Sequence, residues 1–252
     1  MKQVVWGLAV VTFVLGCNRA TKVVRIEAKP LPITAATVVI RSSCPAGMAL
    51  VETAETRVCI DRYEASIEGV EWSAPSHADP HTFVAKPAKG IEPKVNVSEP
   101  EAEAACAGAG KRLCTATEWI AACRGRDEND YPYGKEYRAG VCNEGRPSPA
   151  TSPSTTRLDD ARLAEAPHGI ARGGAFPQCV TEAGVYDMHG NVHEWVSSGP
   201  KPEDPRFGEF HGGFFADGKN NGEGCSYKTT LHFKTYRDYS IGFRCCADVK
   251  AP

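Results

Sequence analysis

The longest hydrophobic pattern in the chain is an almost unbroken apolar run over residues 4–16, which follows Lys2. The run is shorter than the roughly 20 residues that a membrane-spanning helix needs. A basic start followed by a short apolar run is typical of a secretory signal peptide. We therefore predict a signal peptide over residues 1–16.

The run ends in Val14-Leu15-Gly16-Cys17, which is similar to a bacterial lipobox, where cleavage before the Cys is coupled to lipidation of its sulfur. An ordinary signal peptide with an incidental Cys is the alternative interpretation. Residues 18–43 lack a hydrophobic period and contain Pro30 and Pro32, so we expect residues 17–43 to be a lipidated Cys and a flexible tether. A single domain is then expected over 44–252.

Within that domain, the clearest patterns predict a hairpin and two helices. Apolar stretches at 48–51 and 58–60 favour two short antiparallel strands. Capping-box spacings at Ser98 and Thr115, each followed three residues later by Glu, predict helices over 98–109 and 115–123. The region 131–176 is rich in Pro, Gly, Ser and Thr and is expected to be mostly loop, with short strands over 211–248.

Composition places the chain among secreted proteins and excludes some functions. The net charge of −2 gives no basis for binding to nucleic acid. The 11 Cys suit an oxidising compartment, where cysteines form disulfides. Lipidation of Cys17 leaves ten, an even number that fits five bridges.

Five short motifs follow one another over most of the domain: Asp61-Arg62-Tyr63-Glu64, Gly110-Lys111-Arg112-Leu113-Cys114-Thr115-Ala116-Thr117-Glu118-Trp119, Tyr131-Pro132-Tyr133-Gly134, Tyr186-Asp187-Met188-His189-Gly190-Asn191-Val192-His193-Glu194-Trp195 and Gly242-Phe243-Arg244-Cys245. A double glycine, Gly212-Gly213, precedes the last loop. In this order they resemble the formylglycine-generating enzyme (sulfatase-modifying factor) family. The resemblance implies an α+β, C-type-lectin-like fold with little regular secondary structure, stapled here by disulfides.

The motif around Gly190 resembles a calcium loop of that family. The matching ligands are the side chains of Asp187 and Glu194 and the carbonyls of Gly190 and Val192, an all-oxygen set of the kind that calcium prefers. The alternative is a turn in which both carboxylates bond only to backbone amides. His189 and His193 also suggest zinc, but Gly190 and Asn191 between them argue against the helix that a zinc motif of this spacing needs.

The resemblance also narrows the disulfide pairing, which spacing alone leaves open. Family bridges carried over to this chain join Cys106 to Cys245 and Cys123 to Cys225. Cys44 and Cys59 suit a hairpin bridge, and Cys142 and Cys179 would close the long loop. Cys114 and Cys246 remain as the fifth pair.

The resemblance fails at the catalytic centre. Family enzymes oxidise a substrate cysteine with O₂ and a copper ion held by two cysteines in the loop after the double glycine. Here residues 214–222 contain no Cys, and Phe214 stands where the family has Ser. Soft thiolates are the ligands that Cu(I) prefers, so we expect neither copper nor catalytic residues.

The sequence therefore favours a non-catalytic binding or scaffolding domain, lipid-anchored on the periplasmic or outer side of the bacterial cell envelope. We expect a monomer, a protein or glycan partner and structural calcium. The alternative is an oxidoreductase of the wider superfamily, which includes non-haem iron sulfoxide synthases. Those enzymes use a three-histidine iron site with an additional helical domain, for which we expect no room here.

Overall fold

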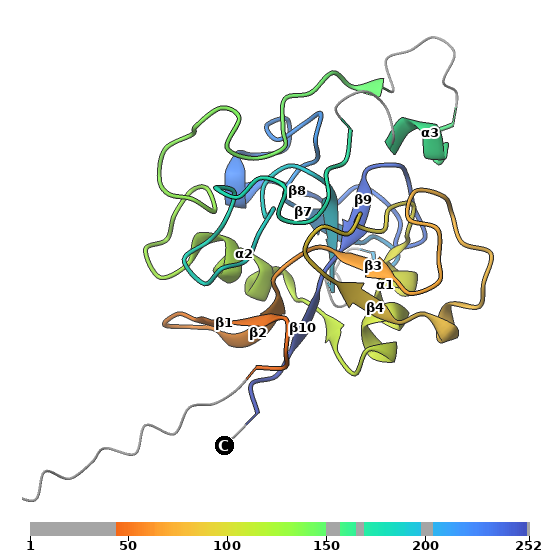
Figure 1. Cartoon of the computed structure of the whole chain (residues 1–252), viewed down its shortest axis with the longest axis horizontal. Coiled ribbons are helices and arrows are strands. Elements are labelled where there is room, and N and C mark those ends of the chain that lie inside the picture. The colour runs from red at the N-terminus through yellow and green to blue at the C-terminus, as the bar shows by residue number, and fades with distance from the viewer. Residues whose placement is uncertain (1–43, 150–156, 165–168, 198–203, 251–252) are drawn as a thin grey trace, which may run out of the picture. The chain divides into compact units, whose positions relative to one another are not determined.

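The computed structural model describes residues 44–149, 157–164, 169–197 and 204–250 (Figure 1). The predicted signal peptide, Cys17 and the whole of the predicted tether lie outside these residues. No helix within the described ranges is both long and apolar enough to span a membrane.

The first sheet has four strands in the order β1-β2-β10-β5: Met48–Glu52, Arg57–Asp61, Cys245–Ala247 and Arg112–Leu113. The predicted hairpin is confirmed, because β1 and β2 pair antiparallel with Met48 opposite Asp61. A tight turn closes it, in which the amide of Thr53 donates to the carbonyl of Thr56 at 2.8 Å. β10 brings the C-terminal end of the chain beside β2 (Figure 1).

The second sheet has the order β8-β7-β6-β9: Lys228–Thr229, Glu209–His211, His193–Val196 and Ile241–Phe243. Its central strand β6 pairs antiparallel with β7 and parallel with β9, which places Glu194 between His211 and Gly242. A third, two-stranded sheet joins β3 to β4: Ala65–Ile67 and Ala85–Pro87.

Both predicted helices are confirmed. α1 spans Glu99–Gly108 after Ser98, and α2 spans Ala116–Arg124 after Thr115. The remaining helical pieces among the described residues are short: α3 and two 3-10 turns, at Ala161–Ala164, Pro80–Thr82 (η1) and Gly224–Ser226 (η3). Where it is described, the predicted loop region over 131–176 contains turns, an isolated bridge between Tyr131 and Gly134, and α3, but no longer element of regular structure.

Two apolar clusters of the core meet at β10. One contains Trp195, Cys106 and Cys245, and the other contains Trp119, Cys114 and Cys246. Successive side chains of a strand point to opposite faces of the sheet, so neighbouring cysteines of β10 enter different clusters. This short strand therefore joins two of the three apolar clusters of the described core.

The capping box of α2 gives a measurable contribution to stability. The Thr115 hydroxyl accepts from the Glu118 amide at 3.2 Å, and the Glu118 carboxylate accepts from the Thr115 amide at 2.9 Å. Replacing Thr115 by Ala is expected to lower the free energy of unfolding by about 1 kcal/mol in a urea titration. Thr117→Ala is the control, because Thr117 lies two residues further along and is exposed. This substitution should change the free energy of unfolding little. Equal losses in the two variants would show that the cap contributes nothing specific.

Candidate functional site

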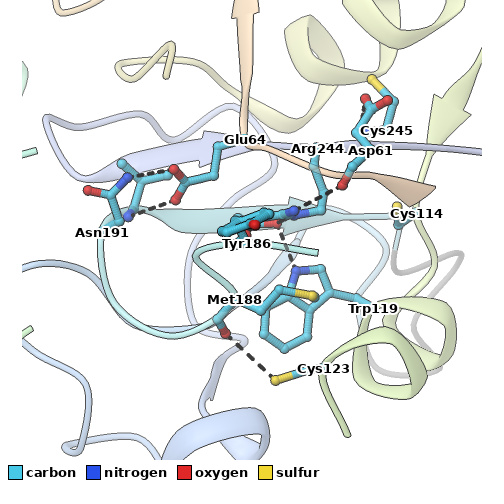
Figure 2. Close-up of polar contacts among 12 residues, drawn as sticks. Asp61, Glu64, Cys114, Trp119, Cys123, Tyr186, Met188, Asn191, Arg244 and Cys245 are labelled. Carbon is cyan, nitrogen blue, oxygen red and sulfur yellow. Dashed lines mark hydrogen bonds and ion pairs between the residues drawn. The ribbon is translucent and has the colours of Figure 1, made fainter. Parts of the chain in front are cut away.

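A buried ion pair lies where the motif segments converge. Arg244, labelled in Figure 2, follows β9. Its guanidinium contacts both carboxylate oxygens of Glu194 on β6, with Nε–Oε2 and Nη2–Oε1 each 2.6 Å. The indole Nε1 of Trp119 on α2 donates to the same carboxylate at 2.8 Å. All three residues are fully buried. Glu194 is thereby paired with a fixed cation in the protein interior.

Arg244 also donates hydrogen bonds to two backbone segments that are far apart in the sequence. Its Nη1 donates to the carbonyl of Asp61 at 3.0 Å, and its Nη2 donates to the carbonyl of Tyr186 at 2.9 Å. The Asp61 carboxylate in turn binds Lys111 at 2.6 Å and accepts from the Cys245 amide at 3.1 Å. Residues from four of the five motifs therefore meet in one polar network, which explains their joint occurrence structurally.

A second carboxylate, Glu64, organises the tight turn of the long motif. Asn191, with φ 58°, donates from Nδ2 to Glu64 at 2.5 Å, and the Val192 amide donates to Glu64 at 3.3 Å. The Asn191 Oδ1 accepts from the Ala171 amide and from Asn143. Burial raises the pKa of Glu64 well above its usual range, and the nearby carboxylates of Asp187 and Glu194 raise it further.

The four predicted calcium ligands lie around this turn, but they do not all fit calcium. Asp187 accepts from the Gly174 amide at 2.7 Å, and burial raises its pKa to about 6. The Gly190 amide donates to the Gly212 carbonyl at 2.8 Å, which fixes the turn. Glu194, however, has both oxygens bound to Arg244. Within the described ranges no three His, Cys, Asp or Glu side chains are grouped for a metal.

Glu194 therefore does not fit the role of a calcium ligand, because the guanidinium of Arg244 already binds both of its carboxylate oxygens. Glu194 also departs from the alternative interpretation, a turn in which the carboxylates bond only to backbone amides, since its partners are the side chains of Arg244 and Trp119. Calcium binding through Asp187 and the carbonyls of Gly190 and Val192 stays a prediction.

The two candidate zinc histidines have different surroundings. His193 packs against the rings of Phe210, Phe214 and Tyr227, with centroid separations of 4.8, 5.0 and 5.4 Å. Burial lowers its pKa to about 3, so the ring is neutral. The ring of His189 instead meets the edge of Tyr131 at 5.4 Å. His193 thus fills an aromatic cluster, and the surroundings of both rings give no support to a zinc site.

The loop after the double glycine is held by its own turn. Gly213 has φ 72°, and a Cβ there would approach the Asp217 carbonyl oxygen to 2.5 Å, so a side chain is excluded. The amides of Phe214 and Asp217 each donate to the other's carbonyl, and Phe215 is fully buried. The Asp217 carboxylate accepts from the amides of Lys219 and Asn220. Aromatic packing and an aspartate turn stand where the resemblance would place copper ligands.

All ten cysteines of the described residues are in disulfides. The pairs are those expected: Cys106–Cys245 and Cys123–Cys225 from the resemblance, Cys44–Cys59 from the hairpin, Cys142–Cys179 from the long loop, and Cys114–Cys246 as the remaining pair. The part of the chain that is described has no free thiol, so a pair of thiolates for copper does not fit it. Five bridges in one domain indicate folding in an oxidising, extracytoplasmic compartment.

Sequence reasoning did not assign roles to Glu64, Asn191 and Arg244, although each lies in one of the quoted motifs. The available signal was a charged or amide side chain inside an otherwise apolar segment. Arg244, for example, follows a buried strand that ends in Phe243 and precedes buried Cys245. A charge in such a place must find a buried partner, but the sequence does not say which one.

Comparison with known proteins finds similarity over most of the chain. The family profile described as "Sulfatase-modifying factor enzyme 1-like domain" matches residues 41–249. The bovine (Bos taurus) protein "Inactive C-alpha-formylglycine-generating enzyme 2" is 30% identical over 179 residues, covering 67% of this chain and 56% of that protein. Its mouse (Mus musculus) namesake is 28% identical over 205 residues, covering 76% and 62%. The chain thus spans about three fifths of the length of these relatives.

Among solved structures, that of PvdO from Pseudomonas aeruginosa is similar with a TM-score of 0.52. The two proteins are 20% identical, and the match covers 79% of this chain and 82% of PvdO, so it supports the shared fold alone. The predicted α+β, C-type-lectin-like fold with little regular secondary structure is confirmed. Because the profile match covers most of the sequence, the chain belongs to the formylglycine-generating enzyme (sulfatase-modifying factor) family.

Proposed function

We propose that this chain is a cell-envelope lipoprotein whose formylglycine-generating-enzyme-like domain acts in binding or scaffolding and not in catalysis. The observation that carries the proposal is the chemistry of residues 213–225. The loop contains Phe214 and Phe215 in a closed turn, and its one cysteine, Cys225, is bonded to Cys123. Copper chemistry of the family type needs two thiolates, and this loop supplies none.

The relatives and the architecture support the same proposal. Two of the similar proteins carry the word "inactive" in their names, and they align with two thirds or more of this chain. Long ordered loops on a disulfide-stapled base present a rigid surface, which suits recognition of a protein or glycan. Family membership by itself does not assign a function, because one fold serves many.

The location follows from the N-terminal sequence. The apolar run over 4–16 and the lipobox-like segment ending at Cys17 support export and a lipid anchor on the envelope. The tether to residue 43 would let the domain reach partners at some distance from the membrane. Structural calcium at Asp187, Gly190 and Val192 belongs to the same proposal.

A thiol count on the folded, exported chain tests the non-catalytic role. We expect no reactive thiol in the domain under denaturing, non-reducing conditions, and a mass increase on reduction that corresponds to five bridges. Titration with Cu(I) in the presence of a competing chelator should then show no tight site. Two reactive thiols with tight copper binding, particularly with Cys225 modified, would reverse the conclusion in favour of oxidative catalysis.

A further inference from the structure

β1 is an edge strand of the first sheet, with β2 as its one neighbour in that sheet (Figure 1). The amide of Thr53 donates to Thr56, and the amide of Arg62 donates to the carbonyl of Gly47 at 3.2 Å. These two bonds fix which pairs of the antiparallel ladder are hydrogen-bonded, since such pairs alternate along it. Met48, Leu50 and Glu52 therefore turn their amides and carbonyls outward.

Two of these outward positions already make the kind of bond that an added strand would make. The Glu52 carbonyl accepts from Nε of Arg126 at 3.1 Å, and the Met48 amide donates to the Pro45 carbonyl at 3.1 Å. No described residue hydrogen-bonds the amide or the carbonyl of Leu50, which lies between them. Arg126 is largely exposed, so it can move aside at little cost.

This edge faces a groove whose opposite wall combines small and charged residues. A cavity of about 370 Å³ lies between residues 50–53 and a wall formed by Ala122, Gly125 and Ala183 together with Arg126 and Glu182. Small side chains allow a second backbone to approach closely. A larger cavity of about 940 Å³ also borders Glu52 and Gly125, and it extends along α2 to Ser226 and Lys228.

The larger cavity carries charges of both signs that are unpaired. Arg124 and Lys228 line it, as do Glu55 and Glu128, and none of the four has an ion-pair partner among the described residues. Mixed charge beside a row of backbone donors and acceptors is complementary to a peptide with acidic and basic side chains. A neutral glycan would leave these charges unmatched, and an acidic one would leave the two carboxylates unmatched.

We propose that the β1 edge binds an extended peptide segment of a partner protein by strand addition. This inference rests on the proposed binding function and names its site. The peptide pairs with the outward groups of Leu50 and Glu52, and its alternate side chains enter the two cavities. Backbone bonds supply affinity and the charged cavity supplies selectivity, as in other cases of strand addition.

The test uses Leu50→Pro and Leu50→Ala in the full chain. Proline removes the outward amide and places its ring in the path of an added strand, while the β1–β2 ladder is preserved because that amide does not take part in it. Alanine keeps the edge open and controls for the loss of the side chain. The disulfide count and melting temperature of each variant report whether the domain still folds.

The probe is a peptide selected on the wild-type chain from a phage library of random dodecapeptides. We expect the synthetic peptide to bind wild type and Leu50→Ala alike and Leu50→Pro at least about tenfold more weakly, the effect of losing a hydrogen bond or two. N-methylation of alternate peptide amides should abolish binding to wild type, which tests the idea even if Leu50→Pro misfolds. Equal binding to Leu50→Pro, indifference to N-methylation or the absence of any binder would overturn the proposal.

Two further measurements distinguish strand addition at the β1 edge from the proposed binding function as a whole. The Leu50 amide should exchange rapidly with solvent in the isolated full chain, and strong protection would mean that the chain itself covers the edge, which would overturn the proposal. A partner cross-linked in the envelope equally by wild type and Leu50→Pro would refute strand addition while leaving the binding function intact.

Discussion

Replacing Glu194 by Gln is expected to lower the free energy of unfolding by about 3–5 kcal/mol, in calcium and in a calcium chelator alike. The reason is that Arg244 is fully buried and loses the anion that balances its charge. Removing one partner of a buried pair leaves an uncompensated charge, which costs more than the pair itself contributes. The neutral amide still accepts from Trp119, so the loss arises mainly from the guanidinium.

Urea denaturation of the wild type and the variant, each with calcium and with chelator, measures this effect. Glu68→Gln is the control, because Glu68 forms an exposed ion pair with Lys86 and should contribute little. Combining Glu194→Gln with Arg244→Met should recover part of the loss, since the buried charge is then removed as well. A loss seen in calcium and absent in chelator would instead assign Glu194 to the metal.

The same titrations report on the remaining calcium prediction. If Asp187 and the carbonyls of Gly190 and Val192 bind calcium, the metal should raise the melting temperature of the wild type and of Glu194→Gln by similar amounts. Binding to the folded state stabilises it in proportion to the logarithm of the free calcium concentration. A melting temperature that does not respond to calcium would remove the metal from this turn.

The contrast between Glu194 and the helices shows what the sequence can specify. The capping boxes at Ser98 and Thr115 are local, and both helices begin where those residues predict. The partner of Glu194 lies 50 positions further along the chain, and that of Asn191 lies 127 positions earlier. A ligand spacing within one turn predicts which oxygens gather there, but it cannot reveal which cation the fold brings to them.

The disulfide pairing was likewise not determined by local spacing, but here the expected pairs are the ones that the structure contains. Spacing left the pairing open, and the family resemblance supplied two of the five pairs, Cys106–Cys245 and Cys123–Cys225, which left few choices for the others. The structure adds the physical reason for the two bridges of β10, because Cys245 and Cys246 point to opposite faces of the strand. Cys245 reaches Cys106 of α1 in one core cluster, while Cys246 reaches Cys114 in the other.

Removing both bridges of β10 is therefore expected to prevent stable folding, whereas removing either one should leave a folded domain. Each bridge contributes about 2–4 kcal/mol, and two together approach the total stability of about 5–15 kcal/mol of an ordinary domain. With one bridge intact, adjacent Cys245 and Cys246 still hold the same strand to the segment 106–114, so the chain gains little freedom when unfolded.

Near-ultraviolet circular dichroism and resistance to proteolysis would measure these effects in variants with paired Cys→Ala substitutions. Removal of Cys44–Cys59 is the control, because that bridge closes a hairpin already held by the β1–β2 ladder. A native spectrum after loss of both β10 bridges would mean that apolar packing around Trp119 and Trp195 holds the core by itself. Collapse after the loss of either one would show instead that the two bridges are not redundant and that each cluster depends on its own.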